Sequence, residues 1–402
     1  MTDIAAEDVS GAQPPGAGSA LNPPNGPAGS LPRRDLIILP LLSLATLIVL
    51  LMFSEIGARL YFAEAIDDSC RIHGTAPGET RDLPNCRSQL KLPEGRMATY
   101  SYNECGYRTD APCGPRPAGV ARVALIGSSM VQSYGVSYDE AFATQAERAL
   151  EKSCGRPVQM ENLGAVGNSI LGMHHQIGEA LGLHPDAVVM MVDPFDVWSL
   201  STYPETTASS AVPQAAPPPE AASPDLVHRV EMALKSSRAV FLMQHFLFKN
   251  RAFYIKAYLL YGDKADFLRS PLTPAWDERL ARFERLAADM AGQAHKAGVP
   301  FVLLLGPQQA QAILMSDKHP PPGVDPRAFG RRMAEIAGRH GMILIDSAEA
   351  FTPVKHPEDD FFPVDGHPDA EGNTVIAHAL VHGLEQGAAP FAACAASRTA
   401  TH

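Results

Sequence analysis

Short, continuous apolar runs alternate with longer stretches of helical periodicity from Val120 to the last predicted helix. The apolar runs predict five strands, at residues 123–126, 158–163, 187–192, 301–305 and 342–345. Strands built from such runs have no polar face, so they must be covered on both sides. The pattern therefore predicts an α/β fold, with a doubly wound parallel sheet as the middle of three layers.

Several helix boundaries carry local signals. Ser137 and Glu140 have the spacing of a capping box, which predicts a helix that continues to about Lys152. Asp325 precedes a proline, and we predict that it is the N-cap of a later helix. The final helix is predicted at about residues 370–386.

One stretch interrupts the alternation between the third and fourth strands. Residues 201–224 contain the run Ala-Ala-Pro-Pro-Pro, which is typical of a linker or loop. A helical stretch rich in Phe, Leu and Tyr follows, at about residues 226–262. This insert, residues 201–262, either caps the functional edge of the sheet or packs on the core, and we favour packing on the core.

The N-terminal part predicts a membrane anchor. Residues 1–34 are rich in Pro, Gly, Ala and Ser, so we expect them to be disordered. The 19 uncharged residues 36–54 are enough to span a bilayer as a helix. A core helix would have a polar face, and a cleaved signal peptide would be shorter and nearer the N-terminus. Because Arg33 and Arg34 precede the run, we predict a single pass through a bacterial inner membrane with a cytoplasmic N-terminus.

Cysteine usage agrees with a main domain in the periplasm or outside the cell. Four of the six cysteines lie close together in residues 55–116, which we call the lead-in segment. Disulfides would stabilise this Gly- and Pro-rich segment in an oxidising compartment, although the sequence leaves their connectivity open. No pair has the Cys-x-x-Cys spacing of a zinc or thioredoxin-like site. The four cysteines are Cys70, Cys86, Cys105 and Cys113.

Charge excludes one class of partner. The chain has 33 Lys and Arg against 44 Asp and Glu, a net charge of −11, whereas nucleic-acid binding needs clustered positive charge. We therefore expect no nucleic-acid partner. The domain of interest spans residues 117–386, and the Ala-rich tail, residues 387–402, is expected to be loose.

Polar residues that could take part in catalysis follow the predicted strands. Gly127-Ser128-Ser129 follows the first strand, a Gly-rich turn around Gly167 follows the second, and Asp365 and His367 precede the last helix. Ligands bind at the carboxyl ends of parallel strands, so these segments belong to one edge of the sheet. A hydroxyl, an imidazole, a carboxylate and glycine backbone amides are the groups that acyl transfer through a serine requires.

The order of these segments resembles the SGNH/GDSL hydrolase superfamily of serine esterases and acylhydrolases over about residues 100–386. Gly127-Ser128-Ser129 aligns with the Gly-Asp-Ser block, and residues 162–167 match the Asn-x-Gly-x-x-Gly block. His367-Pro368 and the residues after it resemble the last block of the family, and the apolar N-terminal run resembles membrane-anchored bacterial members. The resemblance implies an SGNH, flavodoxin-like sheet.

The resemblance also implies a role for each matched residue. Ser129 would be the nucleophile, His367 the general base and then the acid, and Asp365 the residue that orients His367. The backbone amides of Ser129 and Gly167 would form the oxyanion hole. No metal and no organic cofactor is required.

Three departures from the family pattern concern the Asp/His block, the nucleophile loop and the oxyanion. One residue separates Asp365 from His367, whereas many members have two, and an extended backbone still places both on one side. Ser128 stands where the family has Asp, and Phe195 stands where the third family block has an Asn whose side chain donates to the oxyanion. Loss of one such donor costs about 10²–10³ in rate. Asn168 is a candidate substitute for the donor. Trp198 lies after the third strand, and we interpret it as a core residue rather than as part of a substrate cleft.

Three functions remain as hypotheses. The first is an anchored esterase or acyltransferase that acts on an ester-bearing substrate, with an O-acyl group of an envelope glycan as the favoured one. The second is a catalytically impaired relative that binds a glycan or an envelope protein, which Phe195 supports. The third is a scaffold whose insert recruits other membrane proteins.

Overall fold

A computed structural model of the chain describes residues 34–203, 236–388 and 390–394. The chain divides into two compact units, Met1–Phe53 and Ser54–His402. The predicted leader, residues 1–34, lies outside the described residues except for its last position. The description below concerns helix α1 by itself and then the second unit.

Helix α1 (Asp35–Tyr61) contains the apolar run that the sequence singles out. It is long and apolar enough to cross a membrane, and its large apolar side chains are exposed. A helix that exposes so many apolar groups would be unstable in water, because those groups lose the benefit of burial. The helix is therefore consistent with a single-pass anchor, as the sequence predicts.

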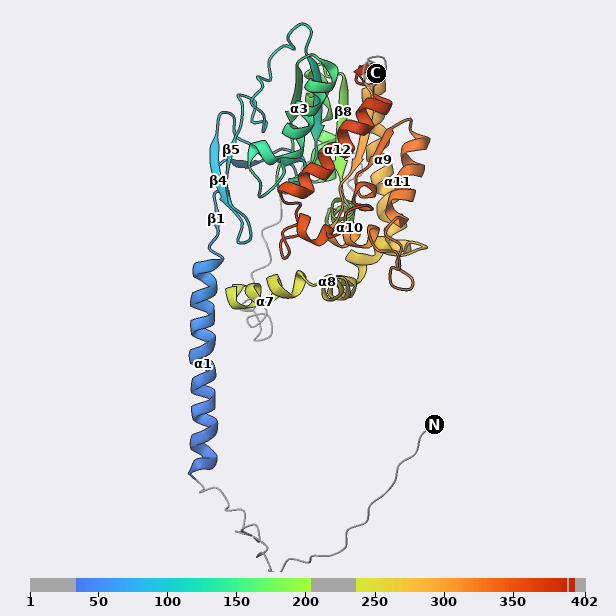
Figure 1. Cartoon of the computed structure of the whole chain (residues 1–402). Coiled ribbons are helices and arrows are strands. Elements are labelled where there is room, and N and C mark those ends of the chain that lie inside the picture. Colours follow the sequence, from blue (N-terminus) through green and yellow to red (C-terminus); the bar gives the residue numbers. More distant parts are fainter. Residues whose placement is uncertain (1–33, 204–235, 389, 395–402) are drawn as a thin grey trace, which may run out of the picture. The chain divides into compact units, whose positions relative to one another are not determined.

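The second unit is built on a five-stranded parallel sheet, which confirms the predicted α/β fold (Figure 1). Its strands run in the order β10-β9-β8-β6-β7, and every neighbouring pair is parallel. All five coincide with predicted apolar runs to within two residues at each end. The strands are β6 (Ala121–Ile126), β7 (Val158–Asn162), β8 (Ala187–Val192), β9 (Phe301–Leu305) and β10 (Ile343–Asp346).

Helices cover both faces of this sheet, which makes three layers. Alternate residues of β8 pack into two different hydrophobic cores, because successive side chains of a strand point to opposite faces. Val188 and Met190 pack with α4 (Ile170–Gly182) and α9 (Pro274–Lys296). On the other face Val189 packs with α3 (Phe142–Cys154) and α12 (Ala370–Gly387). Continuous apolar strands are explained by this two-sided burial.

The strand order fixes where a site can form. Numbered along the chain, the strands of the sheet lie in the order 2-1-3-4-5, so the connections leave in opposite directions on either side of the boundary between β6 and β8. Loops diverge at such a switch point and leave a crevice beyond the carboxyl ends of the strands. The loops after β6 and β8 are therefore the expected walls of a ligand site.

Two helix starts differ from the prediction. Ser137 and Glu140 do form a reciprocal capping box, but it opens a single 3₁₀ turn, η1 (Tyr138–Glu140), and α3 starts after it. The prediction that Asp325 is an N-cap is wrong, because helix α11 (Ala328–Arg339) is capped at Arg327. The Asp325 carboxylate instead accepts a hydrogen bond from the Arg327 N–H at 3.0 Å, which makes a local turn before the helix.

The lead-in segment forms small antiparallel sheets. Strands β4 (Arg87–Lys91) and β5 (Met97–Ser101) pair with each other, and β1 (Ala65–Ile66) pairs with β4. Strands β2 (Arg71–His73) and β3 (Thr80–Asp82) form a separate pair. The four cysteines of the segment form two disulfides, which settles the connectivity that the sequence leaves open. These disulfides are Cys70–Cys86 and Cys105–Cys113.

A third disulfide corrects the prediction of a loose tail. Cys154 at the end of α3 is bonded to Cys394, 240 residues later. Phe391 is fully buried in the core between α3 and α12, so residues 390–394 pack on the domain. Burial of an aromatic side chain together with a covalent link outweighs the weak folding tendency of an Ala-rich segment.

The described part of the insert contributes three helical elements, α7 (Arg238–Phe248), α8 (Arg251–Tyr258) and the 3₁₀ segment η3 (Leu259–Leu268). Tyr258 and Phe267 are buried in the core on the α9 face, in agreement with packing on the core. The predicted linker lies largely in residues 204–235, outside the described residues.

Candidate active site

The predicted nucleophile begins a short helix directly after β6. Helix α2 (Ser129–Gln132) starts with Ser129, so the N–H of Ser129 has no acceptor within the helix. Gly127 makes the sharp turn between strand and helix. A Cβ atom there would lie 2.2 Å from Val131 Cγ2, so the turn has no room for a side chain.

Ser129, His367 and Asp365 meet above the sheet, although 238 positions separate Ser129 from His367. The Nε2 atom of His367 lies 2.8 Å from Ser129 Oγ, and its Nδ1 lies 2.6 Å from Asp365 Oδ1. A carboxylate accepts only, so Nδ1 carries a proton and Nε2 is left to accept the proton of the serine hydroxyl. The geometry is that of a hydrogen-bonded Ser–His–Asp relay.

Charge within the relay tunes the imidazole. Burial alone lowers the pKa of His367, but the hydrogen bond and negative charge of Asp365 outweigh it, so the pKa lies above its ordinary value of 6.5. The same hydrogen bond lowers the pKa of Asp365 against the opposing effect of burial. Asp365 therefore stays ionised and stabilises a protonated His367.

Residues of the lead-in segment and of the insert hold the loop that carries Asp365. The Glu94 carboxylate accepts hydrogen bonds from the backbone N–H groups of Val364 at 3.0 Å and Asp365 at 3.3 Å. The ring of His245 in α7 lies 2.6 Å from the same carboxylate. Glu94 was not singled out in the sequence, and no local motif marks a contact between residues so far apart along the chain.

A residue of the lead-in segment also holds helix α2 in place. Arg108 is only 2% exposed and donates to the carbonyls of Gln132, Ser133 and Val136, with distances of 3.0 Å and 2.7 Å for the last two. Its guanidinium lies 3.9 Å from the ring centroid of Tyr100. The C-terminal carbonyls of a helix need donors, and a cation suits the negative end of the helix dipole.

Replacement of Arg108 by methionine is expected to lower the melting temperature by about 4–8 °C, because three buried carbonyls would lose their donor. Circular dichroism of the full chain in detergent measures this. The exposed Arg96 provides the control, and Arg96→Met should melt with the wild type. Equal melting of both variants would show that Arg108 does not hold α2.

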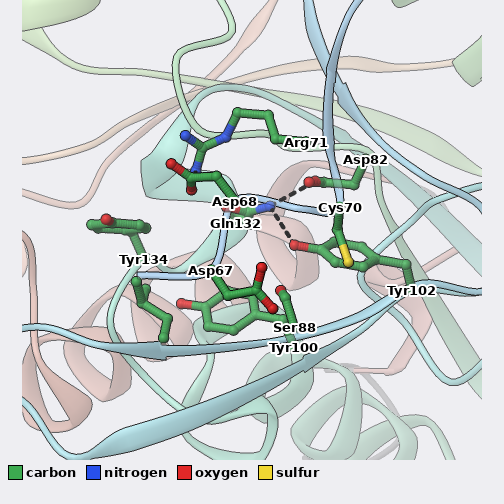
Figure 2. Close-up of a pocket in the computed structure, with 11 residues that line it drawn as sticks. Asp67, Asp68, Cys70, Arg71, Asp82, Ser88, Tyr100, Tyr102, Gln132 and Tyr134 are labelled. Carbon is green, nitrogen blue, oxygen red and sulfur yellow. Dashed lines mark hydrogen bonds and ion pairs between the residues drawn. The ribbon is translucent and has the colours of Figure 1, made fainter. Parts of the chain in front are cut away.

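A small polar pocket lies beside this anchor (Figure 2). In it, the Gln132 side-chain amide of α2 donates to Asp82 at 2.7 Å and to the Tyr102 hydroxyl at 3.0 Å. Burial raises the pKa of Asp82 to about 7. The cavity, about 20 Å³, has room for one water molecule. It therefore serves to join α2 to the lead-in segment and cannot hold a substrate.

The cleft that contains the relay is large enough for a small substrate. Its volume is about 440 Å³, and it is lined by Ser129, Gly167 and His367 together with the residues that follow β8. Gly167 has φ of +80°, a conformation that glycine adopts without strain. Within the described residues the Gly167 N–H has no hydrogen-bond partner, so it is available to a bound oxyanion.

Asn168 does not replace the missing donor. Its amide NH₂ donates to the Gly127 carbonyl at 3.2 Å and to the Gln176 side chain at 3.0 Å. Because both amide hydrogens are used inside the protein, Asn168 braces the glycine turn instead of facing the substrate.

Two buried aspartates lie in the polar loop after β8, a segment expected at this edge of the sheet, but neither was predicted as a site residue. Asp193 and Asp196 cap helix α5 (Pro194–Ser199) reciprocally, and the Ser128 hydroxyl lies 3.3 Å from Asp196 Oδ2. Burial raises the pKa of both carboxyls, that of Asp196 more strongly because Asp193 is its neighbour. The spacing of a capping box in residues 193–196 was the signal that could have found them.

Aromatic side chains form one wall of the cleft. Phe195 is 42% exposed and stacks on Trp198 with 5.6 Å between ring centroids. Trp198 packs against the core, as interpreted from the sequence, but it also lines the cleft. Its Nε1–H donates to Asp263 at 3.2 Å. Lys264 of η3 lines the same wall.

The histidine pair in α4 forms no metal site. His174 Nε2 lies 2.8 Å from Asp289, whereas His175 Nδ1 lies 3.1 Å from Glu79. The two rings therefore point to different partners, as adjacent helical residues do. Among the described residues no group of three His, Cys, Asp or Glu side chains could hold a metal ion.

Similarity to a known protein family extends over the same part of the chain. Residues 125–375 match the model of the GDSL-like lipase/acylhydrolase family, which is more than half of the chain. The chain belongs to this family. Membership of this family of lipases and acylhydrolases implies an ester-containing substrate. A comparison with curated proteins finds no match.

The solved structures to which this GDSL-family chain is similar share little sequence with it. TesA is 14% identical, with a TM-score of 0.38, and the match covers 66% of this chain and 98% of TesA. A mutant of Axe2, an acetyl-xylooligosaccharide esterase from Geobacillus Stearmophilus, is 14% identical over 66% of this chain and 94% of its own, with a TM-score of 0.38. The acetyl xylan esterase AlAXEase is 13% identical over 65% and 99%, again with a TM-score of 0.38.

Proposed function

We propose that this protein is a membrane-anchored, extracytoplasmic serine esterase or acyltransferase that acts on O-acyl groups of an envelope glycan. The observation that carries the proposal is the hydrogen-bonded chain from Ser129 through His367 to Asp365. Such a chain activates a hydroxyl that is otherwise a weak nucleophile.

In the proposed reaction, Ser129 Oγ attacks the ester carbonyl while its proton passes to His367 Nε2. The negative oxygen of the tetrahedral intermediate accepts hydrogen bonds from the Ser129 and Gly167 N–H groups. His367 then gives its proton to the leaving alcohol, and the acyl group stays on Ser129. Water or a second hydroxyl gives its proton to His367 Nε2 and attacks the acyl carbonyl. His367 returns that proton to Ser129 Oγ as the serine leaves. Water makes the reaction hydrolysis, and another alcohol makes it transfer.

Disulfide bonds support the proposed extracytoplasmic location. All six cysteines are paired in disulfides, and such bonds persist in oxidising compartments. The apolar helix α1 with Arg33 and Arg34 before it supports a cytoplasmic N-terminus. The proposed compartment and the ester chemistry of the family support a glycan ester as the proposed substrate.

A fluorophosphonate probe tests the proposal directly. The probe should phosphonylate Ser129 of the detergent-solubilised full chain, and peptide mass spectrometry should find the added mass on the peptide that contains this residue. Labelling should be lost in His367→Gln, which lacks the base. Labelling of another residue, or equal labelling in His367→Gln, would show that His367 does not activate Ser129 as proposed.

The second candidate, an impaired relative that binds a glycan or envelope protein, is favoured by Phe195. Its side chain has no hydrogen-bond donor and lies in the wall of the cleft. A binder should retain glycan binding and lack turnover of aryl esters, whereas the enzyme should show both.

A further inference from the structure

The 3₁₀ segment η3 places a cation in the wall of the reaction cleft. Lys264 belongs to η3, and its side chain lines the cleft that also contains Ser129 and His367. The Lys264 ammonium lies 4.6 Å from the ring centroid of Phe195 and 5.7 Å from that of Trp198. The stacked rings thus present the ammonium beside the opening in which a substrate would lie.

This ammonium has no carboxylate partner among the described residues. The neighbouring Asp263 is paired with Arg279 at 2.5 Å and accepts the Trp198 indole N–H. The carboxylates of the cleft are likewise engaged, Asp365 with His367 and Asp193 with the N–H of Asp196 and the amide of Gln308.

An unpaired cation in a partly buried wall is energetically unfavourable. Burial lowers the pKa of Lys264, and the negative charge of Asp193 opposes this shift. Contact with the two ring faces offsets part of this desolvation, since aromatic faces attract cations. An anionic group on a bound ligand would offset the rest and would be held more tightly than in open water.

We propose that Lys264, Phe195 and Trp198 form an anion-binding subsite, so that the preferred ester carries a carboxylate near the acyl group. The inference rests on the proposed function, because it names the substrate class of the same cleft. The ring faces would pack on the apolar surface of the substrate, and the ammonium would pair with its carboxylate. Phe195 stands where the family has an oxyanion donor. In this subsite it would instead contact the substrate.

Kinetics with matched esters test the subsite. 4-Acetoxybenzoate is compared with its neutral methyl ester, and mono-4-nitrophenyl succinate with 4-nitrophenyl butyrate. The first pair places the charge on the leaving alcohol, and the second pair places it on the acyl group. We expect the ratio of kcat/KM for the charged ester over the neutral one to fall about tenfold in Lys264→Met in at least one pair, and the responding pair identifies which part of the substrate carries the anion.

Two further variants define the comparison. Lys264→Arg should retain most of the preference, because it keeps the charge. Lys256→Met, at an exposed lysine of α8, should leave the ratios unchanged. Unchanged ratios in Lys264→Met for both pairs would overturn the subsite. An equal loss for charged and neutral esters would also overturn it, because Lys264 would then act on the reacting centre.

A binding measurement separates this inference from the proposed function. Titration of 4-acetoxybenzoate into Ser129→Ala by calorimetry should give a Kd about tenfold lower than titration into the Ser129→Ala, Lys264→Met double variant. This comparison needs no turnover, so it decides the subsite even if the chain hydrolyses nothing. Turnover that survives in Ser129→Ala would instead contradict the proposed function.

Discussion

Ser129→Ala is expected to lower kcat/KM for 4-nitrophenyl acetate by at least about 10⁴-fold. The Ser129 hydroxyl is the only atom of the relay that can form the acyl-enzyme, and His367 Nε2 would be left without the hydroxyl from which it accepts a proton. Residual turnover would come from the oxyanion donors and from binding alone, which act without a nucleophile. Release of 4-nitrophenol by the purified full chain measures the effect.

The control is another serine away from the cleft. Ser153→Ala, near the end of α3, should turn over the ester at the wild-type rate. Circular dichroism should show that both variants are folded. If Ser129→Ala stayed within tenfold of the wild type, a different group would have to carry the reaction, and the proposed mechanism would be wrong.

Asp365→Asn is expected to lower the plateau of kcat/KM by about 10³–10⁴ and to move its acid limb to lower pH. The amide can donate to Nδ1, which would put the proton on Nε2, the wrong nitrogen for a base. The sign of the pH shift follows from the charge. Asp365 raises the pKa of His367, so its removal lowers that pKa, and the neutral imidazole persists to lower pH.

A pH profile of the wild type and two variants measures both effects. In the wild type, activity should fall as the pH drops through the raised pKa of His367, because the protonated ring cannot act as base. Asp359→Asn, at an exposed position before the same loop, is the matched control and should leave both the plateau and the limb unchanged. An Asp365→Asn variant with the wild-type plateau would show that Asp365 does not orient His367.

Much of the fold and of the candidate site could be predicted because the signals are local. β8 is apolar throughout because it is buried on both faces, and that pattern needs no knowledge of its neighbours. Ser129 could be predicted because parallel strands place their carboxyl ends at one edge. His367 could be placed there because the loop before the last helix belongs to the same edge.

The features that were missed depend on residues that meet only after folding. The sequence does not show that Arg108 is buried, and only the folded chain shows that it lies against the carbonyls of α2. Glu94 likewise reaches the loop of Asp365 from 271 positions away. Asn168 sits beside Gly167, so its neighbourhood suggested a role in the site, but its amide faces inward to Gln176. Spacing along a chain does not give the direction in which a side chain points.

The disulfide between Cys154 and Cys394 makes a covalent ring from most of the domain. Ser129 lies just before the ring, and His367 lies within it. A single break in the backbone between residues 155 and 366 would therefore leave nucleophile and base in one covalent molecule. A protease that cuts one exposed loop of this ring would therefore not separate Ser129 from His367 covalently unless the disulfide were also reduced.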